Sequence, residues 1–334
     1  MFFSSFSHRD TKPARHITVA VQALALLIIA APVLALPPSV KSVKMVVTNP
    51  PGGSSDIMAR LVAQQLGDIW KKPVVVENKA GAAGLIGMMY AASQSPDGST
   101  LLFGAQGSTI VSPLLSKVPY DMAKDFMPVS IMATGPSILM VNAASPYKTA
   151  QDLIDAARAN PGTINFGSGG VGTAAHLGAE MFNNLAKIKT VHVPYKGGIA
   201  AINDLAANQI QFVFTDAAPV IPYITAGKLR ALAVTSSQRF PLMASVPAFA
   251  EGILPTFIST NSWGLYLPAG AAPELLRELE RDVQKAMREP SLVKRFTELG
   301  FEARYSSAEE FRAFLAIENS RYTKLINENK IKSE

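Results

Sequence analysis

The sequence predicts an α/β protein of two lobes, and three observations support this prediction. Short apolar, β-branched runs alternate with segments of helical periodicity along most of the chain, which is typical of a mostly parallel sheet covered by helices. A chain of 334 residues is long enough to build more than one core. No linker rich in Pro, Gly and Ser divides the chain, so we expect more than one strand to cross between the lobes, as in a hinge.

The first 35 residues have the pattern of a secretory signal peptide. Arg9, Lys12 and Arg15 precede an apolar run of about 15 residues, which ends at Pro32. Val33-Leu34-Ala35 then offers small residues to a signal peptidase, so the predicted cleavage follows Ala35. A transmembrane anchor is the alternative, but the run is shorter than the roughly 20 residues that span a bilayer. We therefore expect an exported protein that is soluble after cleavage.

Composition excludes several kinds of site. Because the chain has no cysteine, it offers no thiol for a lipid anchor, a disulfide or a thiolate metal site. The four histidines include His8 and His16 in the predicted signal peptide, which leaves too few for a zinc cluster. Removing this peptide lowers the formal charge from +6 to +4, since it carries three Lys or Arg and one Asp. The remaining basic residues are scattered, so we expect no nucleic-acid partner.

Ten strands and several helices follow in order along the rest of the chain. The predicted strands are residues 43–48, 74–77, 100–104, 129–133, 138–142, 163–167, 190–194, 212–215, 229–235 and 263–267. Capping boxes begin helices after Thr149 and Ser307, each with an acid three residues later. Thr173 begins another helix, and Pro273 lies in the first turn of a fourth. Their apolar stripes are predicted to form core.

Three loops share one pattern, in which a strand is followed by glycines and hydroxyl residues and then by a helix. They are residues 49–56, 104–109 and 167–173. Glycine lets the backbone approach a ligand closely, and a helix N-terminus offers unpaired N–H groups, so such loops bind anions without Lys or Arg. A Gly-rich turn can also simply connect a strand to a helix. Three of them at the carboxyl ends of strands favour a binding site for a carboxylate or phosphate.

The third loop also admits a nicotinamide-dependent enzyme. Gly167, Gly169 and Gly172 match the G-x-G-x-x-G fingerprint of dinucleotide-binding folds. That fingerprint requires an acid about 20 residues later, at the end of the next strand, to hold the ribose. The next predicted strand ends instead in Tyr195-Lys196. This enzyme therefore stays a minor alternative.

A hydrolase is disfavoured as well. Ser168, His176 and Asp216 are present, but no G-x-S-x-G elbow surrounds a serine. His176 lies in the first turn of its helix, where it is either a donor to a ligand oxygen or a partly exposed, satisfied histidine. Asp216 is predicted to be a loop acceptor or a cap. We expect no enzymatic activity, no cofactor and no metal.

Motifs along the chain resemble one family. They are Pro51-Gly52-Gly53-Ser54-Ser55-Asp56, Pro73-Val74-Val75-Val76-Glu77-Asn78, Pro96-Asp97-Gly98, Tyr120-Asp121 with Lys124-Asp125-Phe126, Asn165-Phe166-Gly167-Ser168, His192-Val193-Pro194-Tyr195-Lys196-Gly197, residues 226–235 and Pro268-Ala269-Gly270. Together they make the chain resemble the substrate-binding proteins of tripartite tricarboxylate transporters, also called the Bug or TctC-like family.

This resemblance implies a type II periplasmic-binding-protein fold, with a ligand between two α/β lobes joined by crossing hinge strands. By analogy, lobe 1 contains residues 36–135 and 263–334, and lobe 2 contains residues 136–262. In this family the ligand carboxylate is held mainly by backbone N–H groups and hydroxyls of the Gly-rich loops, which the resemblance implies for this chain. The ligand-binding positions carried over are Gly53, Ser54, Asp56, Ser108, Thr109, Ser168, Gly172, Thr173, His176 and Asp216.

The function that the resemblance implies is transport. The chain is expected to be a periplasmic monomer that captures a small carboxylate and delivers it to the large and small integral membrane subunits of the transporter. A carboxylate sensor that reports to a two-component system is the alternative, because its docking surface would look alike in sequence. Family members bind dicarboxylates, tricarboxylates, amino acids, aromatic acids and nicotinate-like compounds, so the ligand stays open.

Overall fold

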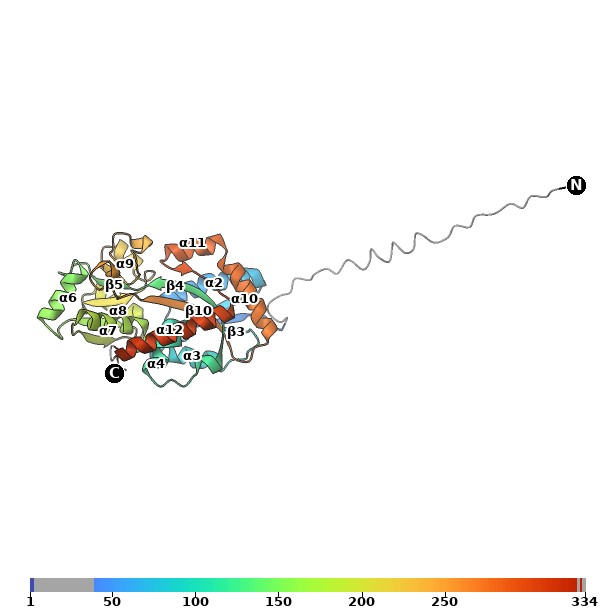
Figure 1. Cartoon of the computed structure of the whole chain (residues 1–334), viewed down its shortest axis with the longest axis horizontal. Coiled ribbons are helices and arrows are strands. Elements are labelled where there is room, and N and C mark those ends of the chain that lie inside the picture. The colour runs from blue at the N-terminus through green and yellow to red at the C-terminus, as the bar shows by residue number, and fades with distance from the viewer. Residues whose placement is uncertain (3–38, 329–330, 332–334) are drawn as a thin grey trace. The chain divides into compact units, whose positions relative to one another are not determined.

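The computed structural model describes residues 1–2, 39–328 and 331, and its main compact unit is Ala35–Glu334 (Figure 1). Apart from Met1 and Phe2, the predicted signal peptide lies outside the described residues, as does its cleavage point after Ala35. Within the described part of the chain, no helix is both long and apolar enough to cross a membrane.

The described residues form two sheets, and the first has six strands in the order β11-β4-β10-β3-β1-β2. Their bounds are β1 Val43–Val47, β2 Val74–Asn78, β3 Thr100–Ala105, β4 Phe126–Pro136, β10 Thr260–Pro268 and β11 Glu302–Ala303. Strands β1, β2 and β3 are parallel, and β10 runs antiparallel to both β3 and β4. The loops that follow β1 and β3 therefore meet at one edge of this sheet.

The second sheet has five strands in the order β7-β6-β8-β5-β9. Their bounds are β5 Ile138–Asn142, β6 Asn165–Ser168, β7 Val191–Pro194, β8 Phe212–Thr215 and β9 Leu229–Val234. Strand β6 is parallel to β7 and β8, whereas β5 is antiparallel to β8 and β9. The chain enters this sheet between β4 and β5, where only Ser137 separates the strands, and returns to the first sheet between β9 and β10.

All ten predicted strands are present, although β4 and β10 are longer than expected and β11 was not predicted. The expectation of mostly parallel sheets is wrong where β5, β10 and β11 pair, because all their ladders are antiparallel. Strands β5 and β10 each begin after the chain crosses from one sheet to the other, and each is inserted in the reverse direction between two strands of its new sheet. The predicted α/β class with crossing strands nevertheless agrees with the observed architecture.

Helices cover both sheets. They are α2 Ser54–Trp70, α3 Leu85–Ala92, α4 Ser112–Leu115, α5 Met122–Asp125, α6 Ala150–Ala159, α7 Ala174–Ala186, α8 Gly198–Ala206, α9 Ile221–Thr225, α10 Pro273–Met287, α11 Pro290–Glu298 and α12 Ala308–Glu328. The capping box predicted at Thr149 is present, because its hydroxyl accepts from the Asp152 N–H and Asp152 accepts from the Thr149 N–H. Ser307 and Glu310 make the same reciprocal pair before α12.

Separate apolar clusters fill the two halves of the unit. Helices α2 and α10 pack on the first sheet through buried residues such as Met58, Leu66 and Leu279, and Trp70 Nε1 donates to Asp282 at 2.9 Å. Phe166, Phe182 and the residues around them form the core of the second sheet. Helix α12 contacts both halves: Phe311 packs with residues of the first sheet, and Tyr322 and Ile326 pack with the second.

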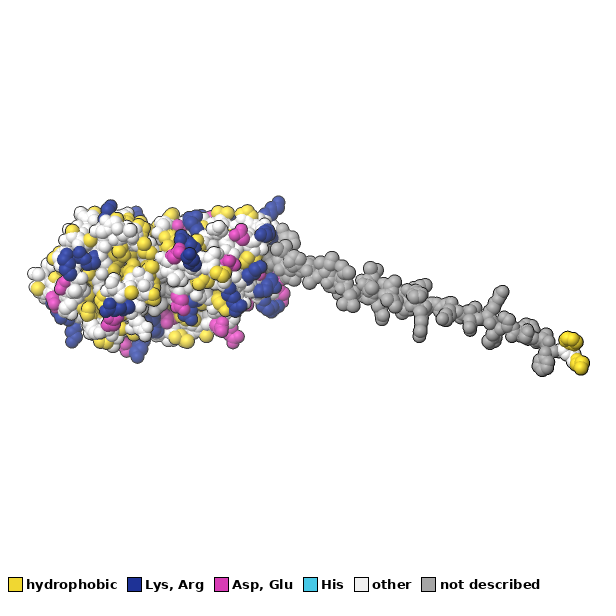
Figure 2. Space-filling model, turned by 90° about the horizontal axis from the view of Figure 1, so that it is seen from above, with side chains coloured by type: hydrophobic (Ala, Val, Ile, Leu, Met, Phe, Trp, Pro, Cys, Tyr) yellow, Lys and Arg dark blue, Asp and Glu magenta, His cyan; other side chains and the backbone are white. Residues whose placement is uncertain are grey.

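The surface carries mixed charge. Figure 2 shows Lys and Arg side chains interspersed with Asp and Glu over the viewed face, without a single basic patch. This distribution agrees with the scatter of basic residues in the sequence.

Candidate functional site

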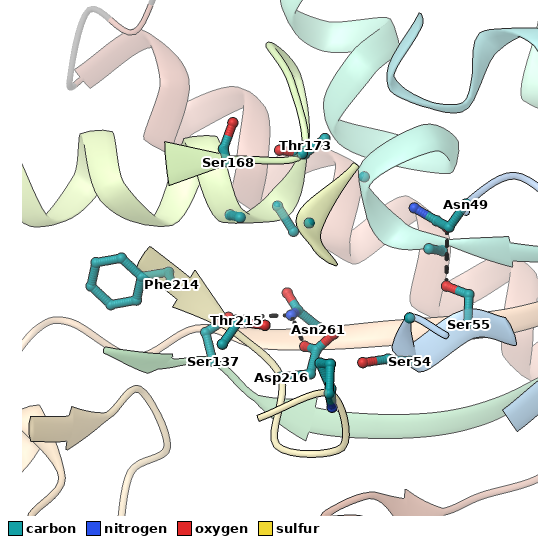
Figure 3. Close-up of a pocket in the computed structure, with 18 of the residues that line it drawn as sticks. Asn49, Ser54, Ser55, Ser137, Ser168, Thr173, Phe214, Thr215, Asp216 and Asn261 are labelled. Carbon is teal, nitrogen blue, oxygen red and sulfur yellow. Dashed lines mark hydrogen bonds between the residues drawn. The ribbon is translucent and has the colours of Figure 1, made fainter. Parts of the chain in front are cut away.

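A cavity of about 140 Å³ lies where the loops of the two sheets meet (Figure 3). Its lining residues fall within segments 49–55, 105–108, 167–175, 198–202, 213–219 and 261–263, together with Ala83 and Ser137. The first, second and last segments belong to the first sheet and its loops, and the others belong to the second sheet and its helices. Parallel strands present their carboxyl ends at one edge, so all three predicted Gly-rich loops contribute to this cavity.

The loop after β1 brings the N-terminus of α2 to the cavity. Gly53 is the N-cap residue of this 17-residue helix, and no side chain caps its first N–H groups. Ser55 Oγ donates to Asn49 Oδ1 and accepts from Trp263 Nε1, both at 3.0 Å, so the loop is tied to β10. The buried Ser54 Oγ has no hydrogen-bond partner of ordinary geometry among the described residues.

The loop after β3 is held from both sides. The hydroxyl of Ser108 donates to the Ala105 carbonyl at 3.0 Å, and Tyr120 Oη donates to the Ser108 carbonyl at 2.5 Å. Gln106 Oε1 accepts from the Ser262 N–H at 3.1 Å. The helical segment η2, Gly107–Val111, begins here, and its wide turn with i+5 hydrogen bonding continues into α4. Glycine at 107 lets the loop after β3 approach the first residue of α7 closely, since a Cβ there would lie 3.3 Å from the Ala174 nitrogen.

The loop after β6 leads into α7, which has 13 residues. Thr173 is its N-cap: the hydroxyl accepts from the His176 N–H at 3.3 Å and donates to the Gly170 carbonyl at 2.8 Å. Ser168 Oγ accepts from the Gly170 N–H at 3.1 Å and lies 2.7 Å from His192 Nε2. The first turn of α7, with Ala174 and Ala175, lines the cavity and directs the positive end of the helix dipole toward it.

A polar cluster forms another wall of the cavity. Asn261 Nδ2 donates to Asp216 Oδ1 at 2.5 Å and to Ser137 Oγ at 3.2 Å. Asp216 is partly exposed where it lines the cavity. Surrounding protein atoms desolvate its carboxyl and raise its pKa, although hydrogen bonding from Asn261 and the proximity of Ser54 oppose this shift. Figure 3 shows Asp216, Asn261 and Ser54 on one side of the cavity, with Ser168 and Thr173 on the opposite side.

The charge in the cavity is unusual for an anion site. Among the described residues that line it there is no Lys, Arg or His, and Asp216 is the only ionisable one. Hydroxyls, amides and the backbone N–H groups of the helix N-termini are the available donors. The side chains of Ile199, Ile202, Val213 and Phe214 add apolar surface between the polar walls. Such a cavity suits a small ligand that has polar ends and an apolar middle.

The structure brings six of the ten predicted positions to the cavity lining and leaves four outside it. Those in the lining are Gly53, Ser54, Ser108, Ser168, Thr173 and Asp216, and those outside it are Asp56, Thr109, Gly172 and His176. Ligand contact by any of the ten stays a prediction.

The four positions outside the lining have structural contacts. Asp56 accepts from the Gly52 N–H at 3.0 Å and pairs with Arg60 at 2.9 Å. Burial by itself raises the pKa of Asp56, but the hydrogen bonds from Arg60 and Gly52 and its other contacts bring it below the usual value. The Thr109 hydroxyl donates to the Ala105 carbonyl, and the Gly172 carbonyl accepts from Ser112 Oγ at 3.2 Å.

His176 is buried. The sequence predicted either a donor to a ligand oxygen or a partly exposed, satisfied histidine, so the partial exposure of the second alternative is not observed. Its ring stacks on His192 at 4.3 Å and lies 6.4 Å from the Phe166 ring. Desolvation, followed by the proximity of His192, lowers its pKa to about 4, so His176 is neutral at pH 7. Its Nδ1 accepts a long hydrogen bond of 3.4 Å from the Gly172 N–H.

Sequence reasoning missed the residues that come from the crossings between the sheets. Asn261, Ser262 and Trp263 line the cavity at the start of β10, and Ser137 lines it between β4 and β5. The one sequence signal was the run of polar residues before the predicted strand at Trp263. Polar side chains at the beginning of an otherwise apolar strand are typical of a strand end that faces a cavity.

Comparison with known proteins agrees with the fold. The family model described as the tripartite tricarboxylate transporter family receptor matches residues 58–331. The protein BugT of Bordetella pertussis is 32% identical over 302 residues, which cover 90% of this chain and 93% of BugT.

Two solved structures from Rhodopseudomonas palustris are also similar. One, determined with adipate, is 29% identical with a TM-score of 0.84, and the match covers 87% of this chain and 98% of that protein. The other, MatC with bound malate, is 25% identical with a TM-score of 0.81 and coverages of 85% and 99%. The predicted family and fold class are thereby confirmed, as is the prediction of a binding protein in place of an enzyme. The chain belongs to the receptor family of tripartite tricarboxylate transporters.

Proposed function

We propose that this protein binds a small carboxylate in the cavity between its two sheets and delivers it to the integral membrane subunits of a tripartite transporter. The observation that carries the proposal is the convergence of three Gly-rich loops and the N-termini of α2 and α7 on a cavity whose described lining has no cationic side chain. Backbone N–H groups at helix N-termini are donors to anions. The adipate and malate present in two similar structures support a carboxylate as the ligand.

Binding in this proposal closes two lobes on the ligand. We assign residues 36–135 and 263–334 to one lobe and 136–262 to the other, with hinge segments around Ser137 and before β10. Two contacts between loops of the two sheets support a closed arrangement. Ser112 Oγ donates to the Gly172 carbonyl at 3.2 Å, and Gly197 lies so close to Pro50 that a Cβ there would collide with Pro50 Cγ.

Export and delivery complete the proposed function. The basic start, the apolar run and the small residues before Leu36 support cleavage after Ala35 and release into the periplasm, where we propose that the protein acts as a monomer. The family match supports large and small membrane subunits as the partners that receive the ligand. Deletion of the gene should then abolish uptake of the ligand, and the protein itself should leave the ligand chemically unchanged.

Thermal denaturation of the purified chain with a panel of mono-, di- and tricarboxylates tests ligand binding. A ligand at 100 times its Kd adds about 2.7 kcal/mol to the stability of the folded state. For a mature chain of about 300 residues this raises Tm by about 4 °C. The matched amides lack the charge that strengthens hydrogen bonds to the loops, so they should give much smaller shifts. A panel without any shift, or amides that stabilise as well as acids, would contradict the proposal.

A further inference from the structure

The two walls of the cavity differ in chemistry: the wall with Asp216 adds an acidic group to the first Gly-rich loop, whereas the opposite wall, at the loop before α7, has no acidic side chain among the described lining residues. The first turn of α7, after Thr173, presents backbone donors on one side of the cavity, and the Asp216 carboxyl lies on the other (Figure 3). A carboxylate has about four acceptor sites. In the described residues, Asn261 Nδ2 occupies one at Oδ1, and Ser54 is the other side chain whose proximity favours the charged form.

The carboxyl of Asp216 accepts a hydrogen bond from its neighbour Asn261. Both hydrogens of Asn261 Nδ2 are used, one toward Asp216 and one toward Ser137 Oγ, so this amide offers a donor to the carboxyl. Asn261 and Ser137 are both buried, which keeps the geometry of this cluster defined. The described residues of the cavity lining supply no cation to balance a charge on Asp216. An ionised carboxyl in such a place is costly unless a bound group compensates it.

From this polarity we infer that the ligand is a zwitterion, with a carboxylate at the α7 side and a protonated nitrogen that pairs with Asp216. The inference rests on the proposed function, since it assumes that the Gly-rich loops hold a carboxylate. A second carboxylate at Asp216 would oppose one negative group to another, whereas an ammonium group would neutralise it and use its free acceptor sites. The apolar side chains of Ile199, Ile202 and Phe214 suit a hydrocarbon chain or ring between the two charged ends.

Isothermal titration of the mature chain with three matched ligand series tests this inference. The probes are 4-aminobutyrate, 5-aminovalerate and 6-aminohexanoate, each compared with the dicarboxylate and the simple fatty acid of the same carbon number. The different lengths are needed because the ligand must span the cavity. We expect the best amino acid to bind at least about 30-fold more tightly than its two matched acids, which is the effect of a desolvated charge pair.

The substitution Asp216→Asn should remove this preference. The amide oxygen can still accept from Asn261, but the charge is lost, so affinity for the amino acid should fall at least about 30-fold. The matched control is Asp282→Asn, a buried acid on α10 that accepts from Trp70 and does not line the cavity. That variant should retain the preference of the unsubstituted protein. Melting of each unliganded variant verifies that it is folded. The order of ligand affinities measured on the unsubstituted protein tests the inference even without the variants.

The possible results separate this inference from the proposed function. Tight binding of dicarboxylates with weak binding of amino acids would overturn the inference and leave carboxylate capture standing; Asp216 would then be a protonated donor to the second carboxylate. An unchanged amino-acid affinity in Asp216→Asn would also overturn it. If none of these acids binds, the zwitterionic ligand is rejected, and the broader carboxylate panel of the thermal test decides whether the proposed function stands.

Discussion

Asn261 near the start of β10 donates a hydrogen bond to Asp216 in the loop just after β8, so one amide and one carboxyl join the two sheets at the cavity wall. The two residues are 45 positions apart in the chain. This contact gives a stability prediction that is independent of any ligand.

Asp216→Asn should raise the melting temperature of the unliganded protein at neutral pH. Burial raises the pKa of Asp216, so the unfolded chain loses this proton at a lower pH than the folded chain, and stability is lost as the pH rises through the folded pKa. Asparagine stays neutral and still accepts from Asn261. We expect a gain on the order of 1 kcal/mol, or about 2 °C. Calorimetry at several pH values measures it, and the gain should vanish below the ordinary carboxyl pKa of 3.8. A lower Tm at every pH would contradict the prediction.

Gly172→Ala should weaken ligand binding, whereas Gly162→Ala should not. Both glycines have a positive φ, +82° and +79°, so alanine costs about 1 kcal/mol of stability at either position. Only at Gly172 does the new Cβ lie 2.9 Å from Ser112 Oγ, where it disturbs the hydrogen bond between loops of the two sheets. A Cβ at Gly162 meets nothing within 4 Å. Titration with the best carboxylate should give about a tenfold loss for Gly172→Ala alone. Equal losses would show that backbone strain, and not the contact, is responsible.

His176 should make the fold less stable in mild acid. Its pKa is about 4 in the folded chain and 6.5 in the reference state, so the unfolded chain binds the extra proton first as the pH falls. Stability is therefore lost between about pH 6.5 and pH 4, by up to about 3 kcal/mol. His176→Phe keeps an aromatic ring beside Phe166 and His192 but removes the titration. Denaturant unfolding at pH 7 and pH 4.5 should show a smaller loss in this variant, and an equal loss would assign the effect to other groups.

The mature protein should begin at Leu36. Because the first 35 residues have the order of a signal peptide, expression with export should yield a periplasmic chain without them. Intact-mass measurement of the purified protein locates the cleavage. Recovery of the uncleaved chain from the membrane fraction would favour an anchor instead.

The local parts of the fold were predictable from sequence. The strands around Val43, Ile138 and Phe212 were predicted because apolar, β-branched runs occur between turn residues. The capping boxes at Thr149 and Ser307 depend on residues only three positions apart. Strand β10 was predicted to start too late because it begins with Thr260, Asn261 and Ser262, whose polarity conceals a strand.

The candidate site was predictable in part, for the same reason. Each Gly-rich loop is a local motif, so the sequence indicated Gly53, Ser108 and Thr173 as positions near a ligand, and they line the cavity. Position within a motif does not reveal which way a side chain faces. Asp56 and His176 belong to the same loops, but Asp56 pairs with Arg60 and His176 stacks on His192, outside the lining.

The family, the order of most strands and helices and the three anion-type loops could be predicted from local patterns, because these depend on residues close together in the chain. The reversed insertion of β5 and β10 between other strands, and the completion of the site with Asp216 by Asn261 and Ser137, could be seen only in the folded arrangement. Strand pairing joins segments that are far apart, and its register is set by packing of the whole sheet. The set of residues that fixes the charge of the cavity is therefore assembled only when the two sheets pack together.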